Sequence, residues 1–354
     1  MCINTVLNLF LPQINVLNKR VKIFLNYFLG PVLFIWVSFS LYREIQQQKD
    51  LNQSWEMIKA SLTGPNQFKI AVVVLLMFVN WGIEARKWQV LVRSIEKIPF
   101  LKAFKAVFTG QSLAVNTPNR IGEYVGRVVY LDEGHRLKGI ALTIVGSLSQ
   151  TIITLLAGVI GMLMMKSDIK ESIRHILSKI GFLETLPTTT IIAYDIILYG
   201  VIFMVVILLI IYFELSWLTK LLERLPFVHR YSYLIEKLED LHVVELTRIL
   251  SLSITRYVVF VVQFILLLQV FEVEIPFWES AGLISVFFLV LAVVPTISSI
   301  ELSLRGLAAV ELFGILSSNK LGIIATAGGL WFINLIIPAL VGSLFIFGIK
   351  LFKR

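Results

Sequence analysis

The feature that most constrains this chain is a series of apolar stretches with few or no charges. Each runs for about 20 residues, the length that a helix needs to cross the hydrocarbon core of a bilayer. Hydrophobic residues fill 57% of the 354 positions and charged residues 16%, whereas ordinary soluble domains carry about 25% charged residues. The sequence therefore predicts an all-α, polytopic integral membrane protein with about seven or eight transmembrane helices.

Seven stretches are predicted to span the membrane, and two further apolar patches, 103–117 and 302–316, are short. Each short patch predicts a broken or re-entrant hairpin. A cytoplasmic N-terminus and seven crossings would leave the basic C-terminus outside, against the positive-inside tendency. An eighth crossing follows if 302–316 spans the membrane or if the last stretch holds more than one element. The predicted spans are 23–42, 70–92, 140–165, 191–213, 249–271, 277–294 and 321–349.

The chain is interpreted as a single membrane domain, 1–354. Because each part of the chain holds one short broken element, the pattern suggests two halves, about 19–213 and 214–354. The polar stretch 166–187 has an amphipathic character and is expected to lie along the outer membrane surface.

The positive charge of the chain indicates its orientation. The formal net charge is +9, and ten Lys/Arg stand against five Asp/Glu between Glu84 and Lys138. Short basic loops favour the cytoplasmic side, so the N-terminus and the 84–138 loop are predicted to be cytoplasmic, in a plasma membrane. Anionic lipid headgroups are the expected partners of these charges, rather than nucleic acid. Glu84, Arg86 and Lys87 are expected at the interface, where long side chains reach water.

The residues predict no metal or cofactor. Cys2 is the only cysteine in the sequence, and the four histidines are scattered without the spacing of metal ligands. A Ser/His/Asp set, a phosphate-binding loop and a His-rich motif are all missing from the sequence, so nothing in it gives positive support for an enzyme.

The densest polar cluster is 116–123, followed by Arg127. Pro118 disfavours helix for the residue before it and suits the first turn of a new helix, so the pattern predicts a chain break and then a helix N-terminus. Arg120, Glu123 and Arg127 would share one face of that helix. Cations near a helix start oppose the helix dipole unless an anion is bound there. The alternative is a cytoplasmic turn with surface ion pairs worth about 0–1 kcal/mol each.

A second cluster repeats these features late in the chain. The segment 295–299 leads into Glu301 and Arg305, which stand one helical turn apart. Interrupted apolar segments at corresponding places in two halves are typical of transporter sites. Ionisable residues at membrane depth face protein or water, because burying them in lipid costs about 2.5–3.5 kcal/mol. The alternative is that Glu301 and Arg305 lie in an interfacial loop.

The first cluster resembles a motif of the lysylphosphatidylglycerol synthase transmembrane-region family, also called flippase-like membrane proteins. The family pattern is Asn, then Pro-x-Arg-x-Gly-Glu, then an Arg one turn later. It also has a Pro and an Arg late in the chain, where Pro295 and Arg305 stand here, and span order and size agree over nearly the whole chain. The residues that match the first motif are Asn116, Pro118, Arg120, Gly122, Glu123 and Arg127.

The sequence departs from the family in two places. Ile300 and Glu301 stand where the late motif has glycines, and 146–150 lacks the acidic–Arg pair and the Asp of many members. No stretch of the sequence could supply the soluble aminoacyl-transferring domain of full synthases, so synthesis of a lysyl-lipid by this chain alone is not expected.

The resemblance implies a flippase-like transporter that moves an anionic or modified polar lipid, or a lipid-linked precursor, between leaflets. Arginine suits the binding of phosphate because its guanidinium forms two parallel hydrogen bonds, so Arg120, Arg127 and Arg305 would hold the headgroup. Glu123 and Glu301 would orient these arginines or exchange a proton. A membrane-embedded transferase on lipid-linked substrates and a non-catalytic scaffold for a separate lipid-modifying enzyme are the alternatives. The expected substrate-binding residues are Asn116, Pro118, Arg120, Gly122, Glu123, Arg127, Glu301 and Arg305.

Overall fold

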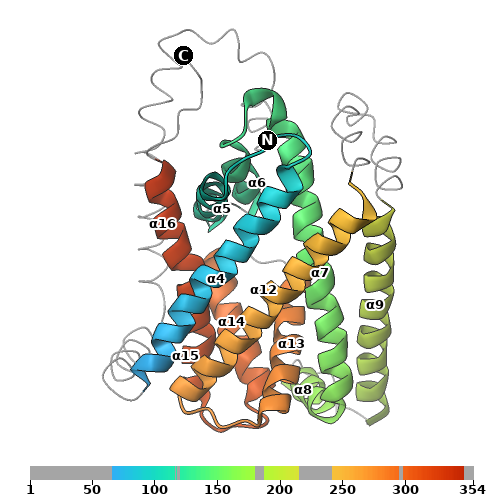
Figure 1. Ribbon diagram of the computed structural model, residues 1–354. Coiled ribbons are helices and arrows are strands. Elements are labelled where there is room, and N and C mark those ends of the chain that lie inside the picture. Colours follow the sequence, from blue (N-terminus) through green and yellow to red (C-terminus); the bar gives the residue numbers. More distant parts are fainter. Residues whose placement is uncertain are drawn as a thin grey trace.

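The computed structural model describes residues 66–115, 117, 120–179, 187–214, 241–294 and 298–346. Within these ranges every regular element is a helix (Figure 1). The predicted span 23–42, together with Asn116, Pro118 and Pro295 of the motifs, lies outside the described residues. The elements are α4 (Gln67–Val92), α5 (Phe100–Val115), α6 (Ile121–Val128), η3 (Glu133–His135), α7 (Arg136–Met164), α8 (Lys166–Lys179), α9 (Pro187–Phe213), α12 (Val243–Val270), α13 (Phe277–Val293), α14 (Ser298–Phe313), α15 (Lys320–Trp331), η6 (Phe332–Ile336) and α16 (Ile337–Ile346).

Five helical stretches are long and apolar enough to cross a membrane, which indicates a membrane protein. They are Gln67–Val92, Glu133–Met164, Ile191–Phe213, Val243–Val270 and Lys320–Ile346. Each corresponds to a span predicted from the sequence. The predicted span 277–294 is also a helix, α13, but it has only 17 residues. The total of seven or eight spans stays a prediction.

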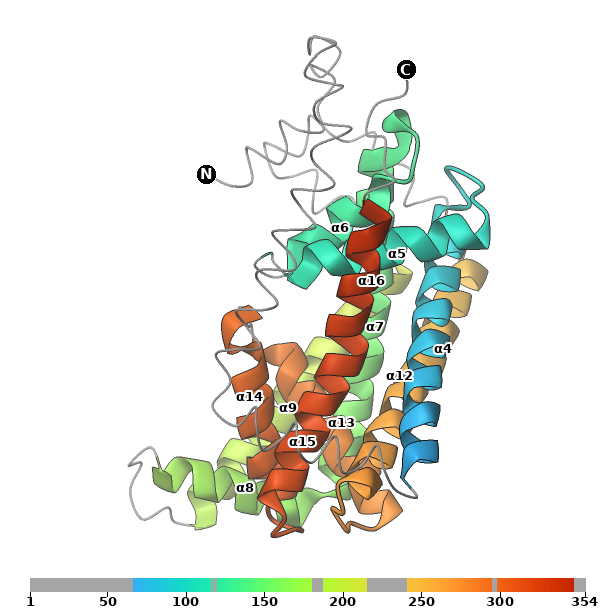
Figure 2. The same ribbon diagram turned by 90° about the vertical axis from the view of Figure 1, so that its left-hand side faces the viewer.

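The long helices α4, α7, α9 and α12 run along the molecule beside the α15–α16 stretch (Figure 1). Turned by 90°, the structure shows α5 and α6 together near one end and α8 lying crosswise near the other (Figure 2). The helices α13 and α14 lie in the same half as α8, and α14 packs against α15, α13 and α8. The two short patches, predicted as broken or re-entrant hairpins, each form one continuous helix, α5 and α14, and these helices are in opposite halves of the bundle.

Apolar packing holds each half together. In the half with α13 and α14, the ring of Phe264 stacks on that of Phe313 with centroids 5.3 Å apart and meets Phe287 edge-on.

On the outside, α9 exposes large apolar side chains, with Ile196 and Phe203 each 67% accessible. Such a face would be unfavourable in water but matches lipid tails, so it supports the assignment of α9 as a span.

The last span is interrupted by one turn of π-helix, η6. Pro338 follows it, and proline has no N–H to donate to the carbonyl four residues earlier, which belongs to Asn334. Widening the turn over Phe332–Ile336 accommodates that missing hydrogen bond. The predicted stretch 321–349 thus contains two α-helices, α15 and α16, joined through this turn.

Candidate functional site

Glycines let α5 and α6 pack closely enough to bring the first motif into the bundle. A Cβ atom at Gly126 would lie 2.6 Å from the Cα of Gly110, and one at Gly122 would lie 2.2 Å from the carbonyl oxygen of Leu113. Thr117 fixes the start of α6, because its Oγ1 accepts a hydrogen bond of 2.7 Å from the Gly122 N–H. The close approach to Leu113 requires a glycine at position 122, because any side chain there would push the two helices apart.

The glutamate at position 84 is the centre of a buried ion cluster. Its Oε1 accepts from Nη1 of Arg127 at 2.8 Å, while its Oε2 lies 2.8 Å from Nζ of Lys87. Nη1 of Arg256 lies 3.0 Å from the same Oε2. The carboxylate of α4 is therefore bound by cations from α4, α6 and α12, and its side chain is only 4% exposed.

A second carboxylate extends the cluster toward the surface. Glu123 accepts from Nη2 of Arg127 through Oε1, and its Oε2 lies 3.5 Å from Nε of Arg120. The side chain of Arg120 is 44% exposed and donates through Nη2 to Oε1 of Gln111 at 2.5 Å. Arg120, in the left-handed conformation with φ of 57°, thus stands at the edge of the buried cluster.

Side chains of α12 and α4 complete the surroundings. Nε of Arg256 donates to Oδ1 of Asn80 at 2.7 Å, and its guanidinium lies over the rings of Trp81 and Phe260 at 5.4 and 5.3 Å. Arg127 lies 5.9 Å from the ring of Trp88. These rings replace part of the hydration that each guanidinium loses on burial.

The cluster contains more cations than carboxylates. When Lys87 carries its proton, Lys87, Arg127 and Arg256 stand against Glu84 and Glu123 and leave one positive charge in excess; Arg120 at the edge adds a second. Burying an ion costs several kcal/mol unless partners compensate it. An excess of positive charge inside an apolar bundle therefore favours an anion at this place.

The same region is rich in hydrogen-bond donors that have no acceptor among the described residues. Every one belongs to a residue of the cluster or to one that touches it, and a buried donor without a partner costs about 1–3 kcal/mol. A ligand with several acceptor oxygens would satisfy both the donors and the excess charge. The donor atoms are Asn80 Nδ2, Trp81 Nε1, Trp88 Nε1, Gln111 Nε2 and Arg127 Nε.

The structure brings four of the predicted site residues together, namely Arg120, Gly122, Glu123 and Arg127. Arg305 lies on α14, a separate element in the other half of the bundle, so the predicted second cluster is not joined to the first. The side chain of Glu301 lies outside the described residues.

The prediction that Glu84 and Lys87 lie at the interface is wrong, whereas Arg86 is exposed. The side chains of Glu84 and Lys87 are 4% and 1% exposed, because they pair with each other and with the arginines of α6 and α12. Arg256 was not among the residues predicted for the site. Two signals could have revealed the cluster: Asn80, Glu84 and Lys87 recur at helical spacing on one face of an apolar span, and Arg256 is a cation within another span.

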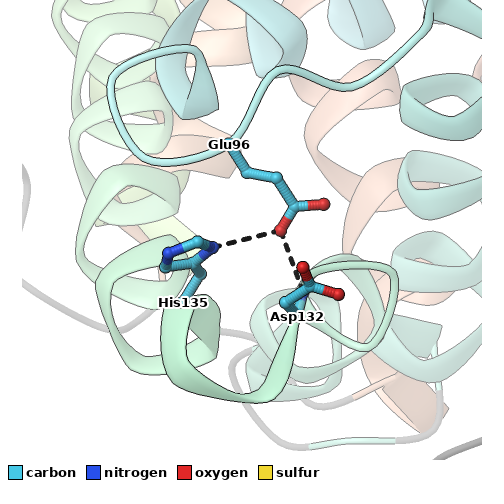
Figure 3. A group of neighbouring side chains, drawn as sticks. All are labelled: Glu96, Asp132 and His135. Atoms are coloured by element: carbon cyan, nitrogen blue, oxygen red, sulfur yellow. Dashed lines mark hydrogen bonds and ion pairs between the residues drawn. The ribbon is translucent and has the colours of Figure 1, made fainter. Parts of the chain in front are cut away.

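A second polar group joins the loop after α4 to the turn before α7 (Figure 3). Oε2 of Glu96 accepts from the Asp132 N–H at 2.9 Å and lies 3.3 Å from Nδ1 of His135, while its Oε1 pairs with Lys102 at 2.8 Å. Burial raises the pKa of Glu96, but these donors outweigh that effect and hold the pKa below its ordinary value. Although side-chain ligand atoms of Glu96, Asp132 and His135 lie within 4.8 Å of one another, the lysine and the backbone N–H already satisfy Glu96, so the group acts as a clamp between loops.

Comparison with known proteins adds no relative. No family model matches the chain, and no curated protein matches it.

Proposed function

We propose that this protein is a flippase-like lipid transporter whose buried ion cluster receives the anionic headgroup of a membrane lipid. The observation that carries the proposal is the excess of buried positive charge that a protonated Lys87 creates beside Glu84, surrounded by hydrogen-bond donors without acceptors among the described residues. A phosphate group offers both the negative charge and the acceptor oxygens that this region lacks.

The geometry gives the arginines different tasks. Both terminal nitrogens of Arg127 are occupied, by Glu84 and Glu123, so Arg127 positions the carboxylates and has only Nε left for a ligand. Arg120 is half-exposed at the edge of the cluster and is the residue that meets an incoming headgroup first. Gln111, which holds Arg120 through Oε1, offers its free Nε2 to the same ligand.

The proposal includes the setting in the membrane. Five of the six charged residues of the cluster belong to the basic 84–138 segment, which the positive-inside tendency assigns to the cytoplasm; only Arg256 comes from elsewhere. A headgroup would therefore enter from the cytoplasmic leaflet of the plasma membrane. Any lipid-modifying enzyme that works with the transporter would deliver its product on that side.

The test compares exposure of lipids on the outer leaflet in cells that lack the protein, express it, or express Arg120→Gln. Arg86→Gln is a matched control, because Arg86 is exposed on α4 and contacts only Gln89 among the hydrogen bonds of the described residues. We expect outer-leaflet labelling to fall in Arg120→Gln to the level without protein, with total lipids unchanged and Arg86→Gln normal. A lipid that appears in or disappears from the total pool would instead indicate a transferase or its scaffold.

A further inference from the structure

Among the cations that bind Glu84, Lys87 is the one that can change its charge. Arginine keeps its proton in proteins, whereas a buried lysine ammonium can lose it. Arg127 and Arg256 are therefore fixed charges, and each carboxylate is bound by at least two cations, which hold it ionised.

The surroundings of Lys87 accept a neutral amine as well as an ammonium. Its Nζ is 2.8 Å from Oε2 of Glu84 on α4 and 3.2 Å from the carbonyl oxygen of Gly146 on α7. From α12, the hydroxyl of Ser253 lies 3.5 Å away and is bonded to Ser149 at 2.9 Å. A hydroxyl both donates and accepts, so this pair can serve either protonation state.

The charges that face Lys87 come from three elements. Glu84 on α4 attracts the ammonium, whereas Arg127 on α6 and Arg256 on α12 repel it. Glu123 on α6 lies beyond Arg127 and belongs to the same charge balance, while α7 contributes only the neutral Gly146 and Ser149 contacts. With Lys87 neutral, the two arginines and the two glutamates balance.

We infer that Lys87 takes up one proton for each anionic headgroup that enters the cluster, so that lipid transport is coupled to protons. This inference rests on the proposed function. In the empty site a neutral amine leaves the buried charges balanced. When an anion enters, the lone pair of Nζ binds a proton from water, and the new ammonium balances the anion. When the anion leaves, Nζ releases its proton. Binding of the anion and binding of the proton strengthen each other by the same factor.

The test uses purified full-length protein in detergent and short-chain phosphatidylglycerol, whose phosphodiester does not titrate near neutral pH. Binding affinity is measured across neutral and alkaline pH, and proton uptake is followed with an indicator dye in weak buffer. Lys87→Arg carries a permanent charge at the same place. Lys87→Met removes the charge, and Arg86→Met, one residue away on the exposed side of α4, is its matched control.

For the wild type and Arg86→Met we expect uptake of about one proton per lipid and an affinity that weakens up to about tenfold per pH unit as pH rises. Lys87→Arg should bind with an affinity that is constant over this range and without proton uptake, and Lys87→Met should bind at least tenfold more weakly. Binding to the wild type without proton uptake, or an unchanged pH dependence in Lys87→Arg, would overturn proton coupling and leave the transporter proposal standing. If no protein binds the lipid at any pH, both proposals fail.

Discussion

Arg256 on α12 lies with Nη1 3.0 Å from Oε2 of Glu84 on α4, so two predicted spans are joined by an ion pair inside an apolar bundle. The same carboxylate binds Arg127 of α6 at 2.8 Å. One glutamate thus connects two long helices to the short α5–α6 pair, and changes at its buried charges should affect both stability and transport.

Glu84→Gln should destabilise the protein strongly. It removes the charge that compensates Lys87, Arg127 and Arg256, and breaking a buried ion pair by removing one partner costs about 3–5 kcal/mol. Thermal unfolding in detergent measures the loss. Glu171→Gln is the control, since Glu171 is 51% exposed and pairs with Arg174 on the surface of α8; such a pair is worth about 0–1 kcal/mol. Equal stability of the two variants would contradict the burial of the Glu84 cluster.

Gly126→Ala should separate α5 from α6. The new Cβ would meet backbone atoms of Gly110 and Thr109 at 2.6 to 2.8 Å, which side-chain rotation cannot relieve, and overpacking of this kind costs about 1–3 kcal/mol. We expect a lower midpoint of thermal unfolding and loss of transport. A Cβ at Gly200 on α9 meets nothing within 4 Å, so Gly200→Ala should retain both properties. Full transport by Gly126→Ala would show that the close helix contact is dispensable.

Acid should weaken the Glu96 clamp. The pKa of Glu96 is lowered in the folded protein by Lys102, the Asp132 N–H and His135, which outweigh burial. Its stabilising effect is therefore present above the pKa of the unfolded chain and is lost as pH falls through the lower pKa of the folded state. The difference in thermal midpoint between wild type and Glu96→Gln should shrink as the solution becomes acidic. A difference that stays constant down to low pH would mean that the Glu96 charge does not hold the loops.

Gln111→Met tests whether the unpaired donors serve a ligand. The change keeps the length of the side chain but removes the buried Nε2, which has no acceptor among the described residues, and the Oε1 that holds Arg120. Losing a satisfied bond and an unsatisfied donor together should change stability by only about 1 kcal/mol. Transport should nevertheless fall several-fold, measured in the same cells as Arg120→Gln. If Gln111→Met is unstable but transports lipid as well as the wild type, this prediction is contradicted.

The spans could be predicted from the sequence because lipid imposes one rule on every helix: about 20 apolar residues in a row. The helices α9 and α12 end within one residue of the expected limits, and they begin four and six residues earlier than expected. The break between α5 and α6 was also visible, since Pro118 interrupts the pattern. The π-turn before Pro338 could not be predicted, because a proline indicates a missing hydrogen bond but not how the helix adapts to it.

Half of the cluster was hidden for a physical reason. A sequence reveals which charges lie close together along the chain, so Arg120, Glu123 and Arg127 were recognised together. The prediction that all three share a helix face is wrong for Arg120, which precedes α6 in the left-handed conformation. Glu84, which binds Arg127, and Arg256, which binds Glu84, come from other helices of the chain. Their pairing depends on how these helices pack. A charged side chain near the end of an apolar span can extend to water or turn into the protein, and the sequence pattern is the same in both cases. Only the packed bundle shows that Glu84 turns inward.

The most direct test reconstitutes the purified protein in vesicles and measures how fast fluorescent phosphatidylglycerol moves between leaflets, with wild type, Arg120→Gln and Arg86→Gln side by side. If the buried cluster receives the headgroup, wild type and Arg86→Gln will move the lipid at similar rates, and Arg120→Gln will be at least tenfold slower while its thermal midpoint is unchanged. If Arg120→Gln moves the lipid as fast as the wild type, the cluster is not the transport site.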